Sequence, residues 1–142
     1  MAISNKDFSK HFETLQNPII DLEAPHKDER GMILPLADEN MKSAVLISSK
    51  KGTVRANHYH HTDWHYCYVL KGEIDYHYRA VGDKKKPRSC IIKAGQMFFT
   101  PPMLEHAMVF TQDTEFLCLG KNPRDQATYE ADITRVQVYP HT

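Results

Sequence analysis

The chain has no excess of charge of either sign, because eighteen Lys and Arg residues balance eighteen Asp and Glu residues. A neutral balance gives no electrostatic attraction toward nucleic acid or an anionic membrane surface, so we expect neither as a partner. The partners that remain are a small-molecule substrate and other copies of the chain.

Long apolar runs are also missing. No segment approaches the roughly 18 residues of a membrane-spanning helix, and the first residues lack the apolar core of a signal peptide. We therefore expect a cytoplasmic protein.

Cysteine is scarce, since Cys67, Cys90 and Cys118 are the only three, and they lie far apart within hydrophobic segments. This pattern indicates reduced core thiols rather than a disulfide framework or a Cys-x-x-Cys zinc site.

What is present is a series of short β-type segments separated by turn signals. The 142 residues, 41% of them hydrophobic, suit a single domain over 1–142. A short N-terminal helix is expected between Asn5 and Leu15, where Phe8, Phe12 and Leu15 have helical spacing. Many short strands predict an all-β sandwich or barrel. We expect strands at 32–35, 44–48, 53–60, 65–70, 73–78, 90–93, 97–100, 107–110, 115–119 and 134–138.

Histidine is abundant, with nine residues, several of them clustered. His58 and His60 are two apart on a predicted strand, so both rings face the same side. His65 begins the next strand and His106 lies on a later one, which makes them available as a third and a fourth ligand. Neutral imidazole binds Zn and the neighbouring transition metals. His61 faces the other way, and the histidines outside this pattern are expected at the surface. These are His11, His26, His77 and His141.

Two spaced motifs resemble those of the cupin superfamily. The first has the form Gly-x5-His-x-His-x4-His-x6-Gly, and the second has the form Gly-x5-Pro-x4-His. His65 stands where the family usually has glutamate, Met103 replaces a glycine, and Phe110 replaces an asparagine. The matching positions are Gly52, His58, His60, His65 and Gly72 in the first motif, and Gly95, Pro101 and His106 in the second.

The resemblance spans roughly residues 44–119. It implies a double-stranded β-helix, the jelly-roll barrel of cupins, with the motif histidines at its mouth. It also implies that these histidines bind one divalent transition metal ion, for which Zn, Fe, Mn and Ni are all compatible with imidazole. The alternative is a barrel lined by the same histidines without metal. The ligands implied by position are His58, His60, His65 and His106.

The segment around Arg55 narrows the chemistry. Arg55-Ala56-Asn57-His58 resembles the Arg-Gly-x-His segment of deoxysugar 3,5-epimerases and nucleotide-sugar 3,4-ketoisomerases, and also the cupin domain of capsule-sugar epimerases. The resemblance implies that Arg55 holds a phosphate and that a motif histidine such as His58 moves a proton beside a ketone. Both roles suit the side chains, because guanidinium pairs with phosphate oxygens and neutral imidazole accepts protons near neutral pH.

A histidine that binds a metal cannot also be a free base, so other side chains are candidates for proton transfer. These are Tyr68, Tyr76, Tyr78, Asp63 and Glu105. Counting by two from His65 and His106 turns Cys67, Val69, Met108 and Phe110 inward and Tyr68 outward. We expect Met97 and Phe99 to complete an apolar floor and Trp64 to stack on a sugar or a base, although ordinary core packing explains the same residues.

Three functions remain open. The first is a keto-sugar isomerase or epimerase acting on a nucleotide-sugar for surface polysaccharide biosynthesis, and it accounts for Arg55 as well as the histidines. The second is a metal-dependent cupin dioxygenase or oxidoreductase. The third is a non-catalytic metallocupin that binds a small ligand. The resemblance also implies a homodimer, for which 32–36 and 135–138 would supply edge strands.

Overall fold

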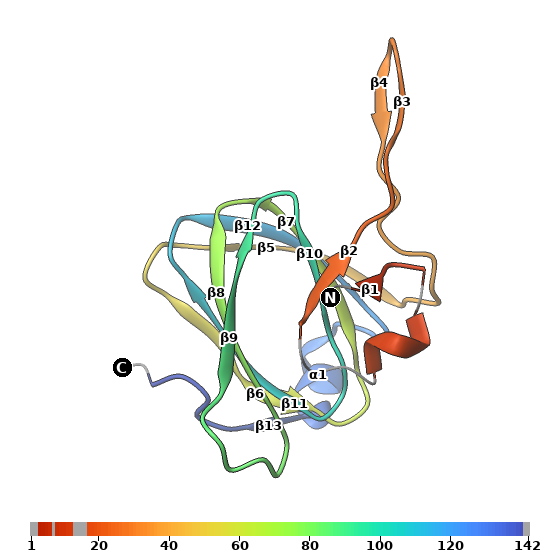
Figure 1. The fold of residues 1–142 in the computed structure, drawn as a ribbon. Coiled ribbons are helices and arrows are strands. Elements are labelled where there is room, and N and C mark those ends of the chain that lie inside the picture. Colours follow the sequence, from red (N-terminus) through yellow and green to blue (C-terminus); the bar gives the residue numbers. More distant parts are fainter. Residues whose placement is uncertain (1–2, 7, 13–16, 141–142) are drawn as a thin grey trace.

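Two β-sheets face each other and form a barrel (Figure 1). The computed structural model describes residues 3–6, 8–12 and 17–140. The predicted all-β jelly roll is confirmed. The larger sheet has the order β1 (Ile3–Ser4), β2 (Ile19–Asp21), β10 (Met97–Thr100), β7 (His65–Lys71), β12 (Thr114–Gly120) and β5 (Ser43–Ser49). The smaller sheet has the order β13 (Ile133–Arg135), β6 (Val54–His60), β11 (Leu104–Phe110), β8 (Glu73–Ala80) and β9 (Arg88–Lys93).

The barrel strands lie where alternation of apolar residues predicts them, with ends that differ by a few residues. β11 begins at Leu104 rather than at 107, and β13 ends at Arg135 rather than at 138. The predicted N-terminal helix is the short 3-10 helix η1 (Phe8–Phe12), while Leu15 lies outside the described residues. β2 and the α-helix α1 (Gln126–Asp132) were not predicted.

Side chains on the two faces of the larger sheet enter different cores. Cys67 and Val69 on β7 point between the sheets, as predicted, and pack with Phe110 and Phe116. Tyr66 and Tyr68 point to the opposite face, where a second cluster forms around Met97, Phe99, Trp64 and Ile20. The alternation of a strand therefore separates a barrel interior from an outer core that the N-terminal segment covers.

A hairpin made of β3 (His26–Asp28) and β4 (Gly31–Ile33) extends away from the barrel as a narrow arm (Figure 1). Its strands pair with each other and with no other strand among the described residues. Met32 and Ile33 on β4 are 60% and 72% exposed. In the described ranges no helix is long and apolar enough to cross a membrane.

Candidate metal and substrate site

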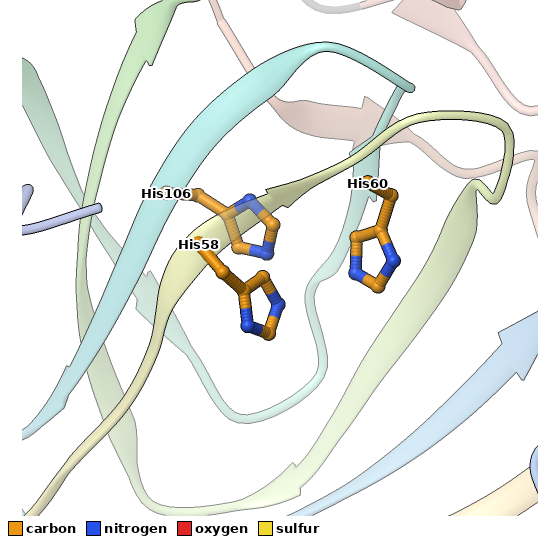
Figure 2. A group of neighbouring side chains, drawn as sticks. All are labelled: His58, His60 and His106. Carbon is orange, nitrogen blue, oxygen red and sulfur yellow. The ribbon is translucent and has the colours of Figure 1, made fainter. Parts of the chain in front are cut away.

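Three histidines from two adjacent strands meet inside the barrel. His58 and His60 lie on β6, and His106 lies on β11 directly opposite His58. One ring nitrogen of each lies within 4.8 Å of the others, and all three side chains are buried. Figure 2 shows the three rings turned toward a common space. The structure thus brings together three of the four residues that sequence spacing suggested as ligands.

A β-bulge at Asn57 lets Arg55 share this side of the sheet. Residues 55 and 58 are an odd number of positions apart, so in a regular strand their side chains would face opposite sides. On β11, however, His106 pairs with His58, and Ala107 pairs with Ala56, so Asn57 has no partner on that strand. The extra residue reverses the alternation. Arg55 then lies opposite Met108, and both line the same cavity as His58.

Asn57 is fixed in the bulge by the C-terminal segment. Its side-chain amide donates to the Tyr139 carbonyl, and its side-chain oxygen accepts from the Val138 and Tyr139 amides at 3.0 and 2.9 Å. Ala56 and Asn57 have positive φ angles of 71° and 53°. The bulge therefore depends on residues some 80 positions away in the sequence, and the segment after β13 orders one wall of the site.

The three histidines are neutral and have free lone pairs. Burial lowers the pKa of His58 to about 2 and that of His106 to about 4, and it also lowers the pKa of His60. His106 Nδ1 donates to the Leu104 carbonyl at 2.8 Å, which leaves Nε2 as an acceptor. The Nδ1 atoms of His58 and His60 have no hydrogen-bond partner. Three neutral, buried imidazoles that bring one nitrogen each within 4.8 Å of the others fit a divalent transition metal.

His65, the fourth predicted ligand, lies beside this group in a different role. Its ring centroid is 4.7 Å from that of His60, but its Nε2 is 2.9 Å from the Asp63 carboxylate. Burial alone would lower the pKa of His65, yet Cys118 and Asp63 together raise it. A Cβ on Gly120 would come within 2.9 Å of the ring, so the glycine makes room for it. Metal binding by His65 stays a prediction.

A cavity of about 410 Å³ contains these side chains. Its apolar part is formed by Cys67, Phe98, Met108, Phe116 and Cys118 together with other residues between the sheets. Apart from the histidines, the charged residues that line the cavity are all arginines. No acidic residue is among the described lining side chains. The arginines are Arg55, Arg124 and Arg135.

Three predicted substrate contacts lie elsewhere. Trp64, Met97 and Phe99 belong to the outer cluster on the far face of the larger sheet, so the prediction that they line the cavity is wrong. The reason is the register of β10. Phe98 pairs with the inward residue Cys67, and directly opposed residues share a face, so Phe98 rather than its neighbours points inward.

The proposed proton-transfer side chains also lie away from the cavity lining. Tyr68 packs in the outer cluster. Tyr76 is fully buried, its hydroxyl bonds to Thr100 Oγ1 at 2.6 Å, and burial raises its pKa well above the usual value. Glu105 accepts two bonds from Arg79 at 2.9 and 2.8 Å on the face opposite His106. Neighbours on a strand face opposite sides, so Glu105 and His106 cannot both reach the cavity.

Other histidines divide between surface and core. His11, expected at the surface, is buried, with Nδ1 2.8 Å from the Tyr66 hydroxyl and Nε2 donating to the Ser4 carbonyl. His26 is exposed, and His61 contacts Thr134 Oγ1 outside the site. His77 is half-buried with Nε2 3.1 Å from Asp75, and His141 lies outside the described residues.

Helix α1 and the residues just before it bring two side chains to the site that sequence reasoning missed. The Tyr129 hydroxyl lies 3.4 Å from His58 Nε2, and burial raises the pKa of Tyr129 to about 12. The guanidinium carbon of Arg124 lies 3.6 Å from the centre of the Tyr129 ring. Asp132 at the end of the helix accepts bonds from the Thr62 and Asp63 amides and so holds α1 over the histidines.

Comparison with known proteins identifies the family. A model of the cupin domain matches residues 45–120, which is more than half of the chain. The chain belongs to the cupin family. No curated protein sequence shows significant similarity to this cupin.

Solved structures share the fold of this cupin at low sequence identity. QdtA, a sugar 3,4-ketoisomerase from Thermoanaerobacterium thermosaccharolyticum in complex with TDP, aligns with a TM-score of 0.66 and 18% identity over 87% of this chain and 91% of that chain. RmlC from Legionella pneumophila, a dTDP-6-deoxy-D-glucose-3,5-epimerase, aligns with 0.64 and 17% over 82% and 70%. The capsular polysaccharide assembling protein CapF from Staphylococcus aureus aligns with 0.61 and 18% over 89% of this chain and 36% of that chain.

Proposed function

We propose that this cupin is a cytoplasmic enzyme that isomerises or epimerises a keto-sugar carried by a nucleotide, for the synthesis of a surface polysaccharide. One observation carries the proposal: the cavity next to the histidines is lined by three arginines and, among the described lining residues, by no acidic side chain. Guanidinium groups pair with phosphate oxygens, so such a lining suits a diphosphate-bearing substrate. Structural similarity to QdtA, RmlC and CapF supports the same class.

The side chains of the cavity would have three roles. Arg55 and Arg124 would hold the diphosphate. His65 would take a proton from the carbon beside the ketone, and Asp63 would stabilise the imidazolium that forms. Tyr129, whose pKa of about 12 keeps its proton in place at neutral pH, would donate a hydrogen bond to the substrate oxygen on which negative charge develops.

His58, His60 and His106 would hold a divalent metal ion, which would polarise the ketone oxygen when bound. The donor set supports this assignment, because neutral, buried imidazoles with one nitrogen each within 4.8 Å of the others are suitable ligands. Zn, Fe, Mn and Ni all remain compatible with three nitrogen ligands.

The test combines binding with proton exchange. TDP binding is measured by calorimetry, and TDP-4-keto-6-deoxyglucose is incubated in D2O and followed by NMR. We expect TDP to bind and deuterium to appear on a carbon next to the ketone, since isomerisation and epimerisation both pass through that deprotonated carbon. Arg124→Ala should weaken TDP binding at least tenfold, while Arg30→Ala on the distant arm should not change it. Absence of exchange with bound nucleotide would contradict the proposal.

The three-histidine group favours a second candidate, a metal-dependent dioxygenase or related oxidoreductase acting on a small organic substrate. Nitrogen ligands that leave coordination positions open suit oxygen chemistry at iron. Oxygen uptake by the iron-loaded protein, without deuterium exchange into a nucleotide-sugar, would favour this candidate. Ligand binding with neither reaction would indicate a non-catalytic metallocupin.

We also propose that the chain forms a homodimer through the β3–β4 arm. An isolated two-stranded hairpin is marginally stable in water, and this one exposes Met32 and Ile33. A second copy of the chain would bury both side chains. Light scattering after size exclusion should give a molecular mass of twice the 16.4 kDa of one chain. The double variant Met32→Asp/Ile33→Asp should have the mass of a single chain. Leu70→Asp, at an exposed site on the barrel, is the matched control. A monomeric wild type would rule the proposal out.

A further inference from the structure

Two cysteines form a pair in the wall of the cavity. Cys67 on β7 and Cys118 on β12 are direct partners across the antiparallel ladder, so their side chains lie side by side on the same face of the sheet. Both side chains line the cavity that contains the histidines. The proposed isomerase chemistry uses neither of them.

The pairing geometry suits a disulfide. Directly opposed residues of antiparallel strands have Cα atoms about 4.5 to 5.5 Å apart, and disulfides form across about 4.4 to 6.8 Å. β7 and β12 are each hydrogen-bonded to a strand on both sides, so the two backbones are held in this register. No movement of the strands is therefore needed to bring the sulfurs together.

Cys90 provides a contrast within the same chain. It is half-buried on β9, it lies opposite Tyr76 rather than another cysteine, and it is not among the residues that line the cavity. A reagent that enters the cavity thus meets two adjacent thiols, whereas Cys90 has no cysteine across the ladder with which to react.

We propose that Cys67 and Cys118 are a modification site at which a hydroperoxide entering the cavity produces an intramolecular disulfide. One sulfur attacks the peroxide, so that an S–O bond forms, the O–O bond breaks and water or an alcohol leaves. The second sulfur then attacks the first, the S–S bond forms, and the oxygen leaves as water. The two thiols lose two electrons and two protons in total, and the peroxide is reduced. Intracellular disulfides are usually transient and redox-sensing, and this one is placed to change the lining of the cavity.

The test counts free thiols. The protein at micromolar concentration is treated with hydrogen peroxide, quenched with catalase, denatured and alkylated with iodoacetamide, and its intact mass is measured. We expect three alkylated cysteines before treatment and one after it, a peptide map that joins the segments containing Cys67 and Cys118, and recovery of all three with dithiothreitol.

Variants assign the bond without depending on activity. Cys90→Ala should lose both of its alkylation sites on oxidation, whereas Cys67→Ala and Cys118→Ala should each keep both. Persistence of three alkylated cysteines in the wild type, sulfinic acid on separate cysteines, or a disulfide-linked dimer through Cys90 would each overturn the proposal. The wild-type peptide map decides the question even if a variant folds poorly. None of these results depends on whether the protein acts on a nucleotide-sugar.

Discussion

His58 on β6 and His106 on β11 are direct partners across the sheet, and their ring centroids lie 5.0 Å apart. His60, two residues along β6, completes the group from the same face. The site is therefore built by the pairing of two strands rather than by a loop, which fixes the ring positions through backbone hydrogen bonds. A centre placed in this way is arranged by the fold before any ligand binds.

Removal of one ring should abolish metal binding. We expect about one equivalent of metal per wild-type chain, measured by mass spectrometry on protein purified without a metal-affinity resin, and nearly none in His58→Ala or His106→Ala. His61→Ala is the matched control, because His61 belongs to the same segment but contacts Thr134 outside the site. Equal metal content in all four proteins would remove the ligand assignment.

His65 has a distinct expected role, which Asp63→Asn tests. The asparagine keeps the shape of Asp63 but removes the charge that supports an imidazolium on His65. We expect deuterium exchange into the keto-sugar to fall about 100-fold or more, with TDP affinity and metal content unchanged. Asp75→Asn, which removes the partner of the distant His77, should leave exchange intact. Loss of metal in Asp63→Asn would instead indicate that the pair serves the metal centre.

The faces of regular strands were readable from the sequence. Cys67 and Met108 point inward as counting by two from His65 and His106 predicts, because β7 and β11 run without interruption over those residues. The prediction for Met97 and Phe99 failed because the register of their strand was unknown. β10 is only four residues long, and nothing in it shows that Phe98, rather than Phe99, lies opposite Cys67.

Contacts between residues far apart in the sequence could not be predicted from local sequence patterns. Tyr129 reaches His58, and Arg124 lies on the Tyr129 ring, because α1 docks through Asp132. A seven-residue helix without a buried residue has no amphipathic signal. The bulge that turns Arg55 inward depends on bonds between Asn57 and the C-terminal segment. Arg55 lines the cavity, which alternation alone would not have predicted, and its role in substrate binding stays a prediction.

Two of the departures from the motifs lie at positions with a left-handed backbone. Ala56 and Met103 stand where related sequences have glycine, and their φ angles are 71° and 62°. A left-handed conformation costs a residue with a Cβ roughly 1–2 kcal/mol, so the chain tolerates strain at both positions. The motif glycine is therefore explained by the left-handed backbone at that position rather than by a role in the chemistry.

Ala56→Gly should accordingly stabilise the protein. Relief of the strained φ angle outweighs the greater freedom of glycine in the unfolded chain, which costs about 0.5–1 kcal/mol, so a gain of up to about 1 kcal/mol is expected in urea unfolding. Ala44→Gly on β5, where φ is not positive, is the control and should lose about 0.5–1 kcal/mol. A loss of stability in Ala56→Gly as large as that in Ala44→Gly would show that position 56 is unstrained.

His106 should make the stability of the metal-free protein depend on pH. Burial lowers its pKa to about 4 in the folded state, whereas the unfolded chain has the ordinary value of 6.5. Between these values the unfolded state binds a proton that the folded state does not, so stability falls as the pH falls, by about 1.4 kcal/mol per pH unit for this residue. His106→Asn removes this contribution, and its unfolding free energy should depend less steeply on pH by about that amount.

Urea unfolding in a chelator at pH 7, 6 and 5 measures the slopes, with the exposed His26→Asn as the control. Equal slopes for wild type and His106→Asn would mean that His106 takes up its proton without unfolding the barrel.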